Sequence, residues 1–443
     1  MPNEGPTVVE DVTCTFCGCL CDDITLEVEG NRITAARNAC ALGESWFFED
    51  RSGPDAVCLI DGEPGPLEDG IERAARILAD ARYPLVHGLC HTSTQAQRVA
   101  VSIGDLIGGC VDTSSHAASG ASTLALQEIG EVTCTLGEVK NRGDLIVFWG
   151  CDPALSHPRH LSRYSLEPRG TFLPRGRADR FCVVVDVCET KTAKLGDQFL
   201  PIKAGAQFEA LWALRALIKG VELDPAGIET ETGVSLSAWQ DLLDRMKRAR
   251  YGVIFFDPSS TSFVDAHLNC HAIFALTRDM NAHARFVCVP LGGRGNSSGA
   301  ENVLTWQTGY PWGVNLARGY PRFSPGDYSS TPTLERSEAD AAIIIAGDPM
   351  SYFGDKACER LRRIPTIVLD SGTTATTRIA TIVFRTATCG INTPGTVYRA
   401  DGVSIPVRGA VFSPLPTDEA ILKKIERRVR ELKADADLEG RPS

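Results

Sequence analysis

The spacing of apolar residues predicts strands that alternate with helices over most of the chain. Short apolar runs typical of buried strands occur at 83–89, 144–150, 180–186, 251–257, 286–291 and 341–346. Apolar positions at helical spacing occur at 67–81, 92–108, 208–219 and 264–282. This alternation predicts an α/β fold with mostly parallel sheets, whose ligands bind at the carboxyl ends of the strands.

Both ends of the chain and one internal stretch have a different pattern. Residues 23–29 alternate polar and apolar positions, which predicts a strand with one solvated face; a Gly-Asn turn and a return strand at 33–36 follow. Residues 420–432 predict a charged helix. Residues 292–333 are rich in glycine, proline and aromatic residues, and we expect a long functional loop there.

The pattern and the length of 443 residues predict several lobes. The expected division is a cysteine-rich lobe at 1–55, a first α/β lobe at 56–175, a second at 176–325, and a return to the first lobe with a C-terminal segment at 326–443.

Composition restricts the classes of partner. The net charge of −11 argues against nucleic acid as the main partner, because phosphate binding needs a basic face. The chain starts without a signal-like segment, and its apolar runs are too short to span a bilayer. We therefore expect a cytoplasmic protein without a membrane partner, in which sixteen cysteines do not form a disulfide framework.

Five cysteines cluster near the start of the chain. Cys14, Cys17 and Cys21 follow a C-x2-C-x3-C spacing, and Cys40 is a distant fourth thiol. This pattern is typical of a four-iron cluster. A zinc knuckle is the alternative, but zinc sites usually have two C-x2-C pairs and the second is absent, so iron–sulfur is favoured. The spacing alone leaves open whether Cys19 or Cys21 is the third ligand.

Acidic residues follow three of the predicted strands. Asp186 ends one strand, and the sequence Gly-x-Asp-Pro around Asp152 is echoed by Gly-Asp-Pro at Asp348. Each carboxylate could bind a nucleotide or could cap the following helix. At any one position a helix cap is the favoured interpretation, but three similar strand ends together favour nucleotide binding.

Two histidine pairs are further candidates for ligand contact. His267 and His271 share one face of a predicted helix, but no third metal ligand is evident, so a packed pair is the favoured interpretation. His157 and His160 lie in a predicted polar loop, where ligand contact and a solvated basic loop are equally supported.

Several long motifs resemble the B subunits of formylmethanofuran dehydrogenase, a family of the dimethyl sulfoxide reductase type of molybdopterin oxidoreductases. The first is Cys-Thr-x-Cys-Gly-Cys-Leu-Cys-Asp-Asp at 14–23 with Asn-Ala-Cys at 38–40. The other similar blocks are at 135–142, 157–162, 305–311, 318–322 and 395–403. The matches run in order from about residue 10 to about residue 410.

The resemblance implies a multi-lobed architecture around a cofactor cleft, with a small cysteine-rich β lobe. It implies a [4Fe-4S] cluster beside a molybdenum or tungsten bis-pterin guanine dinucleotide, and it makes Cys21 the third cluster ligand. Other subunits of the complex are the implied partners. The residues that the resemblance assigns are Cys14, Cys17, Cys21 and Cys40 for the cluster, and Asp186, Thr190, Gly205 and Asp348 for the dinucleotide.

One position departs from the family pattern. The family holds its metal through a cysteine or selenocysteine followed by histidine, and the flanking residues place Ala118 and Ser119 there. A methyl group cannot ligate a metal. Two hypotheses follow: a redox subunit that interconverts carbon dioxide and formate, or a non-redox subunit of a formyltransferase/hydrolase complex. The second is favoured for the chemistry, so this chain itself need not be an enzyme.

Overall fold

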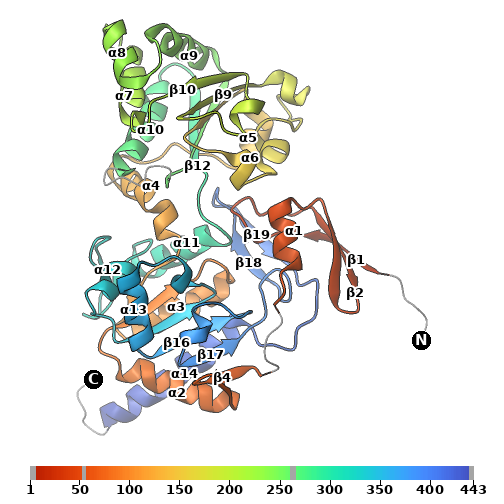
Figure 1. Ribbon diagram of the computed structural model, residues 1–443, viewed down its shortest axis with the longest axis vertical. Helices are drawn as coiled ribbons and strands as arrows, with labels where there is room; N and C mark the ends of the chain where they lie inside the picture. Colours follow the sequence, from red (N-terminus) through yellow and green to blue (C-terminus); the bar gives the residue numbers. More distant parts are fainter. Residues whose placement is uncertain (1–5, 52–55, 260–265, 439–443) are drawn as a thin grey trace. The chain divides into compact units, whose positions relative to one another are not determined.

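The computed structural model describes residues 6–51, 56–259 and 266–438. These residues form two compact units. The first unit contains the chain up to His116, Arg294–Arg399 and the part from Ser404 onward; the second contains Ala117–Gly293 and Ala400–Val403 (Figure 1). The four-part division expected from the sequence has different boundaries and stays a prediction.

A three-stranded antiparallel sheet forms the cysteine-rich lobe of the first unit. Its strands are β1 (Thr7–Val12), β2 (Ile24–Glu29) and β3 (Arg32–Arg37), in that order. Gly30 and Asn31 both have positive φ, which the tight β2–β3 turn requires. The predicted hairpin is thus confirmed. Helix α1 (Ala41–Phe48) begins directly after Cys40.

A nine-stranded sheet is the framework of the first unit. Its order is β14-β13-β7-β6-β15-β16-β17-β4-β5, and β7, β6, β15, β16 and β17 run parallel. The strands are β4 (Cys58–Ile60), β5 (Glu63–Pro64), β6 (Pro84–Gly88), β7 (Cys110–Val111), β13 (Val314–Asn315), β14 (Arg322–Phe323), β15 (Ala341–Ile345), β16 (Thr366–Asp370) and β17 (Ile382–Arg385). A separate hairpin joins β18 (Gly395–Tyr398) to β19 (Ser404–Val407).

The helices of the first unit cover this sheet. Helix α14 packs against both α2 and α3, as Figure 1 shows for α14 and α2 near the C-terminus. α12 packs against α13, and α11 against α3. The bounds are α2 (Leu67–Asp80), α3 (Thr94–Leu106), α11 (Ser297–Thr308), α12 (Ser330–Glu335), α13 (Asp355–Arg363) and α14 (Asp418–Leu438).

The second unit is built on a five-stranded parallel sheet of order β10-β9-β8-β11-β12. Its strands are β8 (Leu145–Trp149), β9 (Phe181–Asp186), β10 (Gln198–Pro201), β11 (Tyr251–Phe256) and β12 (Arg285–Pro290). Its helices are α4 (His116–Ile129), α5 (Leu136–Arg142), α6 (Pro153–Ser156), α7 (Gln207–Ile218), α8 (Pro225–Thr232), α9 (Leu236–Arg248) and α10 (Ala266–Met280). α4 begins at the last residue of the first unit.

The apolar strands predicted from the sequence are confirmed, and their burial explains why the apolar pattern identifies them. Every residue of β6, β8, β11 and β15 is buried, as expected for parallel strands covered on both faces. In the second unit, the core includes the stacked rings of Trp149 and Trp239, 6.2 Å apart. The predicted α/β fold with mostly parallel sheets is therefore correct.

One local expectation is wrong, and one of two open alternatives is ruled out. Residues 292–333 are not one long loop, because they contain α11, the β13–β14 pair and the start of α12. Glycine at both ends of α11 hid its periodicity, and its buried face is made mainly of small residues. The segment with His157 and His160 is also not a solvated loop: both imidazoles are buried, and a five-residue π-helix follows at Leu161–Ser165.

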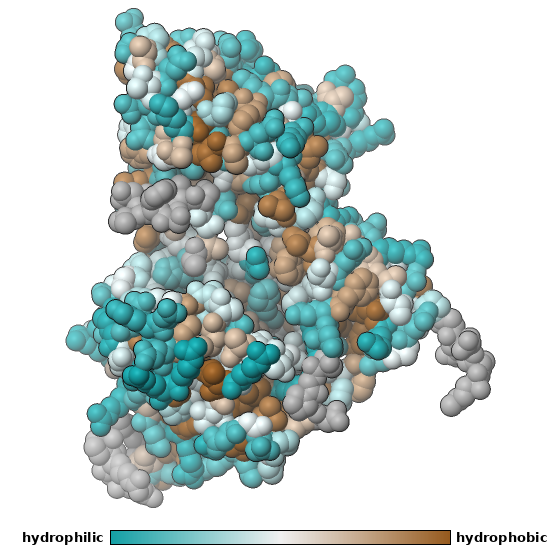
Figure 2. Space-filling view, viewed as in Figure 1, coloured by the Kyte–Doolittle hydropathy of each residue, from teal (hydrophilic) through white to brown (hydrophobic). Residues whose placement is uncertain are grey.

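No helix in the described part of the chain is long and apolar enough to cross a membrane. On the face seen in Figure 2, hydrophilic residues surround small separate groups of hydrophobic ones.

Candidate functional site

The clustered thiols lie on a closed loop of the cysteine-rich lobe. The Cys14 amide donates to the Cys21 carbonyl at 2.8 Å, and the Leu20 amide donates to the Cys17 carbonyl at 3.2 Å. Cys14, Cys19 and Cys21 are buried, and Cys17 is half-buried. The loop thus holds these thiols inside the lobe rather than displaying them to solvent.

Cys40 joins this group from the start of α1. A side-chain carbon added at Gly43 would lie 3.3 Å from Cys14 Sγ and 3.8 Å from Cys40 Sγ. Glycine therefore leaves room where the first and last thiols of the motif converge. Burial raises the pKa of Cys14, and the negative charges of Cys17, Cys21 and Cys40 raise it further. The four predicted ligands are electrostatic neighbours in the fold.

Cys19 has a different environment from the other thiols. Its side chain hydrogen-bonds with the Cys17 thiol, and this bond lowers the pKa of Cys17 to about 7 while it raises that of Cys19. Within the described ranges, no three His, Cys, Asp or Glu side chains converge tightly enough to hold a single metal ion. Tetrahedral zinc would need thiolates about 3.8 Å apart, whereas an iron–sulfur cube binds each thiolate to a different iron.

Arg294 and Gly295, which follow β12 in the chain, form backbone contacts with the thiol loop. Cys17 forms an isolated antiparallel bridge with Arg294, and the Gly295 amide donates to the Phe16 carbonyl at 2.9 Å. The Arg294 guanidinium lies 5.6 Å from the centre of the Phe16 ring, and its charge contributes to lowering the pKa of Cys17. This arrangement places a positive charge beside the thiol loop.

In the second unit, the carboxyl ends of β8 and β9 are tied together by one carboxylate. Asp152 Oδ1 accepts hydrogen bonds from the Thr192 amide at 3.0 Å and from the Thr192 hydroxyl at 2.6 Å. Thr192 Oγ1 in turn accepts from the Ala154 amide at 3.0 Å. Asp152 does not cap its own helix α6, so the capping interpretation is wrong here.

The first unit contains the same arrangement at the ends of β15 and β16. Asp348 Oδ1 accepts from the Thr376 amide at 2.8 Å and from the Thr376 hydroxyl at 2.6 Å. Thr376 Oγ1 accepts from the Met350 amide at 3.1 Å. Asp348 caps no helix either. At both predicted Asp-Pro turns, the aspartate therefore links the ends of two neighbouring strands by hydrogen bonds.

The repeat extends to the acids at the ends of β9 and β16. Asp186 and Asp370 each precede two threonines at the same spacing, Asp-x3-Thr-x-Thr. Thr190 Oγ1 accepts from the Ala193 amide, and Thr374 Oγ1 accepts from the Thr377 amide, both at 3.1 Å. The sequence prediction includes Asp186 and Thr190 but misses Asp370, although this spacing identifies it.

Burial changes the ionisation of both strand-end acids. It raises the pKa of Asp186, and it raises that of Asp370 to about 7. A cavity of about 430 Å³ lies beside the Asp370 turn, lined by Thr373, Thr377 and Arg378 among others. Gly205, between β10 and α7, has φ +84° with open space around it. An acceptor at the carboxyl end of a parallel strand suits a ligand that presents N–H donors.

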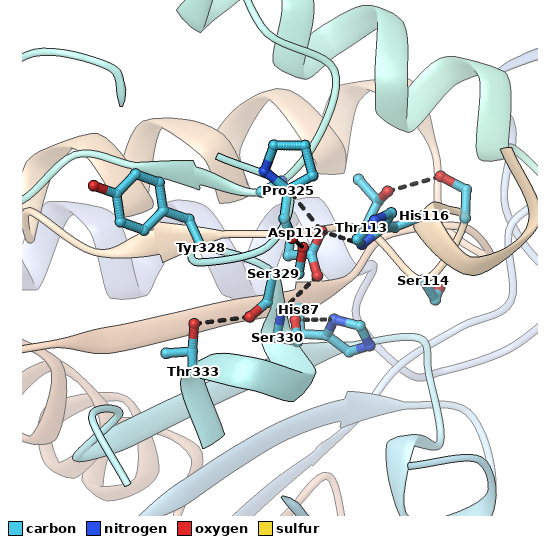
Figure 3. A network of polar contacts seen from close by, with 12 residues as sticks. His87, Asp112, Thr113, Ser114, His116, Pro325, Tyr328, Ser329, Ser330 and Thr333 are labelled. Carbon is cyan, nitrogen blue, oxygen red and sulfur yellow. Dashed lines mark hydrogen bonds and ion pairs between the residues drawn. The ribbon is translucent and has the colours of Figure 1, made fainter. Parts of the chain in front are cut away.

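The segment that precedes the expected metal-ligand position is anchored by Asp112. This buried carboxylate accepts from the Ser330 amide at 2.7 Å and the Gly313 amide at 3.2 Å, and it lies 3.8 Å from His116 Nδ1. Figure 3 shows Asp112 between His116 and Ser330. The His116 ring also stacks on Trp312, with the ring centres 3.9 Å apart.

A second imidazole is held next to this carboxylate. His87 Nδ1 hydrogen-bonds with the Ser330 hydroxyl and Nε2 with the Tyr352 hydroxyl, both at 2.8 Å (Figure 3 shows the first). Burial lowers the pKa of His87 to about 4, so this ring is neutral near pH 7. Sequence patterns give no signal for His87, because its partners come from distant segments.

Ala118 and Ser119 lie in the first turn of α4. Ala118 is half-buried and presents only a methyl group, and the Ser119 carbonyl accepts from the Ser122 hydroxyl at 2.9 Å. The structure therefore offers no ligating atom from the Ala118 side chain.

The histidine pairs do not form a metal site in the described residues. His160 is fully buried, 4.5 Å from the Phe255 ring centre, and burial lowers its pKa to about 3. His267 and His271 do lie on one helix, α10, as predicted.

Comparison with known proteins adds relatives that cover nearly the whole chain. This chain is 39% identical over 435 residues to the B subunit of tungsten-containing formylmethanofuran dehydrogenase 2 of Methanocaldococcus jannaschii. The match covers 96% of this chain and 99% of that protein. The protein of the same name from Methanococcus maripaludis is 37% identical, with 96% and 100% covered. No protein-family model matches.

More distant similarities agree with these. The B subunit of the formyltransferase/hydrolase complex Fhc of Methylorubrum extorquens is 26% identical over 66% of this chain and 74% of that protein. The crystal structure of that organism's FhcABCD complex with methylofuran contains a similar fold, with TM-score 0.71, 24% identity, and 85% and 99% covered. Acetylene hydratase from Pelobacter acetylenicus has TM-score 0.69 at 12% identity, with 95% and 69% covered. This chain belongs to the family of formylmethanofuran dehydrogenase B subunits.

Proposed function

We propose that this chain is the non-redox B subunit of a formyltransferase/hydrolase complex of one-carbon metabolism. The observation that carries the proposal is Ala118, which stands at the position of the expected metal-ligating cysteine. Its methyl group has no lone pair to give to molybdenum or tungsten. Ser119 replaces the neighbouring histidine and is no proton carrier near neutral pH. The chain then supports chemistry that takes place in a partner subunit.

In this proposal the partners are the other subunits of the complex. They transfer a formyl group from a tetrahydromethanopterin carrier to a methanofuran-like carrier and hydrolyse it to formate. The transfer moves no electrons, so it has no need of a redox metal in this chain. The similarity to the B subunit of the Methylorubrum extorquens complex supports this assignment. We expect the complex to be cytoplasmic.

The residues present fit an iron–sulfur cluster. Cys14, Cys17, Cys21 and Cys40 would hold a [4Fe-4S] cluster, which supplies one-electron transfer when it is bound. The room that Gly43 leaves beside Cys14 and Cys40 supports this assignment. In the non-redox subunit, the thiolate bonds would mainly cross-link the thiol loop to the start of α1.

The strand-end turns fit the nucleotide parts of a pterin guanine dinucleotide. Asp186 and Asp370 would accept hydrogen bonds from the N–H groups of guanine, and the pterin dithiolene supplies metal ligands when the group is bound. Thr190 and Thr192 shape the first turn, and Asp348 braces the second. Gly205 would leave open space next to the first turn.

The second candidate is a redox subunit that interconverts carbon dioxide and formate. The observation that favours it is the 39% and 37% identity to two relatives whose names state that they contain tungsten. Retention of all four cluster thiols agrees with it.

Metal analysis of the intact, anaerobically purified complex separates the two. We expect no stoichiometric tungsten or molybdenum and no formate oxidation with a viologen acceptor. Stoichiometric tungsten or molybdenum together with formate oxidation would overturn the proposal. The matched variant is Ala118→Cys, purified in the same way: if the missing thiolate is the defect, we expect this variant to gain metal and the unsubstituted chain to lack it.

A further inference from the structure

The thiol loop and the start of α1 have to stand at a fixed distance for one cluster to reach all four thiols. Cys14 and Cys17 lie on the loop, whereas Cys40 directly precedes α1. Thiolates carry like charges and repel one another, so they do not draw the two segments together. Uncharged contacts must therefore fix this distance in the metal-free chain.

One side of α1 faces the thiol loop. Cys40, Gly43 and Trp46 follow one another at intervals of three residues, which places them on the same side of the helix. A side-chain carbon added at Gly43 would lie 3.3 Å from Cys14 Sγ, so this side of α1 lies against the first thiol of the motif. Trp46 carries a large aromatic ring on the same side.

A hydrogen bond joins Trp46 directly to the thiol loop. Its indole Nε1 donates to Thr15 Oγ1 at 3.2 Å, and Thr15 lies between Cys14 and Cys17. Thr15 is buried, and its hydroxyl donates onward to the Cys389 carbonyl at 3.4 Å. The Thr15 hydroxyl therefore links the loop both to α1 and to the segment after β17.

Three further side chains fix the ring of Trp46. Its centre lies 6.1 Å from that of the Phe16 ring and 5.7 Å from that of the His91 ring. The Arg51 guanidinium lies 4.4 Å from the centre of the indole, and its Nη2 donates to the Trp46 carbonyl at 2.7 Å. Because Phe16 belongs to the thiol loop and His91 follows β6, the indole packs between the loop and the nine-stranded sheet.

We propose that Trp46 is a positioning residue for the iron–sulfur cluster. Through Thr15 and Phe16, it holds the thiol loop at the right distance from the start of α1 before iron binds. The inference rests on the proposed cluster assignment and adds to it a residue that ligates no iron. Groups that orient the ligands of a metal change how well the metal is retained, so loss of Trp46 should show as faster loss of iron.

Iron loss from the anaerobically purified full-length chain tests the proposal. The chelator bathophenanthroline disulfonate forms a coloured complex with the released iron, which gives the rate. We expect Trp46→Ala to lose iron at least about tenfold faster than the unsubstituted chain, because it lacks both the hydrogen bond and the ring contacts. Trp306→Ala removes an indole that is 58% exposed elsewhere in the same unit, and it should lose iron at the unsubstituted rate.

Further variants separate positioning from a general loss of stability. Trp46→Phe keeps an aromatic ring without the N–H, and Thr15→Val removes the acceptor; each should speed iron loss about threefold to tenfold. The double variant should be no faster than the faster single variant, because both changes break the same hydrogen bond. Thr15→Ser keeps the hydroxyl and should restore the slow rate. These variants retain most of the packing, so they provide the test if Trp46→Ala does not fold.

The outcomes for this inference and for the cluster assignment differ. Equal rates of iron loss in the unsubstituted chain and in both Trp46 variants would refute the positioning role and leave the cluster assignment intact. Effects that multiply in the double variant would refute the link through Thr15, and with it the proposal. An unsubstituted chain without iron would instead overturn the cluster assignment, and this inference would fall with it.

Discussion

Asp152 Oδ1 accepts hydrogen bonds from both the amide and the hydroxyl of Thr192, at 3.0 and 2.6 Å. Asp348 and Thr376 repeat this relationship in the other unit, at 2.8 and 2.6 Å. In each case a carboxylate that follows one strand fixes the loop that follows the neighbouring parallel strand, β9 in the second unit and β16 in the first. The loops that present Asp186 and Asp370 are therefore held by the same device.

Removal of the Thr192 hydroxyl should destabilise the second unit. Thr192→Val keeps the shape of the buried side chain but leaves the Ala154 amide without its acceptor. We expect a loss of about 1–3 kcal/mol, measured as a lower midpoint of thermal or urea unfolding. Thr192→Ser keeps the hydroxyl and should lose much less. Equal midpoints for the two variants would show that the brace is not stabilising.

Asp370 should make stability depend on pH. Burial raises its folded pKa to about 7, and the charges of Asp418 and Asp348 contribute, against an unfolded value of about 3.9. Between these values the folded state keeps a proton that the unfolded state releases. This contribution to stability is complete below about pH 4 and is lost as the pH rises through about 7.

Asp370→Asn provides the test of this pH dependence, because asparagine cannot ionise. The thermal midpoint of the unsubstituted protein should fall relative to that of the variant as the pH is raised from 4 to 8. A difference that stays constant over this range would contradict the buried, protonated state of Asp370.

Serine substitutions should separate the cluster ligands from Cys19. We expect anaerobic protein to contain about four irons per chain with broad visible absorption. Cys21→Ser should lose both, whereas Cys19→Ser should retain them, because we propose Cys21 as the third ligand, whereas Cys19 hydrogen-bonds with Cys17. Loss of iron in Cys19→Ser with retention in Cys21→Ser would reverse the assignment.

Asp112 should be needed for the stability of the first unit. Its two oxygens accept from the Gly313 and Ser330 amides. Asp112→Asn turns one acceptor into a donor that faces an N–H group, and we expect it to lower the unfolding free energy by about 1–3 kcal/mol. Asp80→Asn, at an exposed position, is the matched control in the same unfolding measurement. Equal midpoints for the two variants would contradict an anchoring role.

The sequence by itself determined the elements that bury apolar residues on both faces. Leu145–Trp149 and Ala341–Ile345 are uninterrupted apolar runs, and each is followed within three residues by a glycine and an aspartate. The local pattern alone therefore identifies each run as a strand that leads into a turn. The thiol motif is equally local, because three of its four cysteines lie within eight residues. The small, glycine-flanked buried face of α11 has no such pattern, so the sequence predicts a loop where the structure has a helix.

Only the tertiary structure decided which distant residues the strand-end acids contact. The sequence shows acids after strands, but only the parallel pairing of β8 with β9 and of β15 with β16 brings Asp152 to Thr192 and Asp348 to Thr376. Likewise, His87, Asp112 and Ser330 come from segments up to 243 residues apart. Long-range contacts of this kind depend on strand order, which no local periodicity contains.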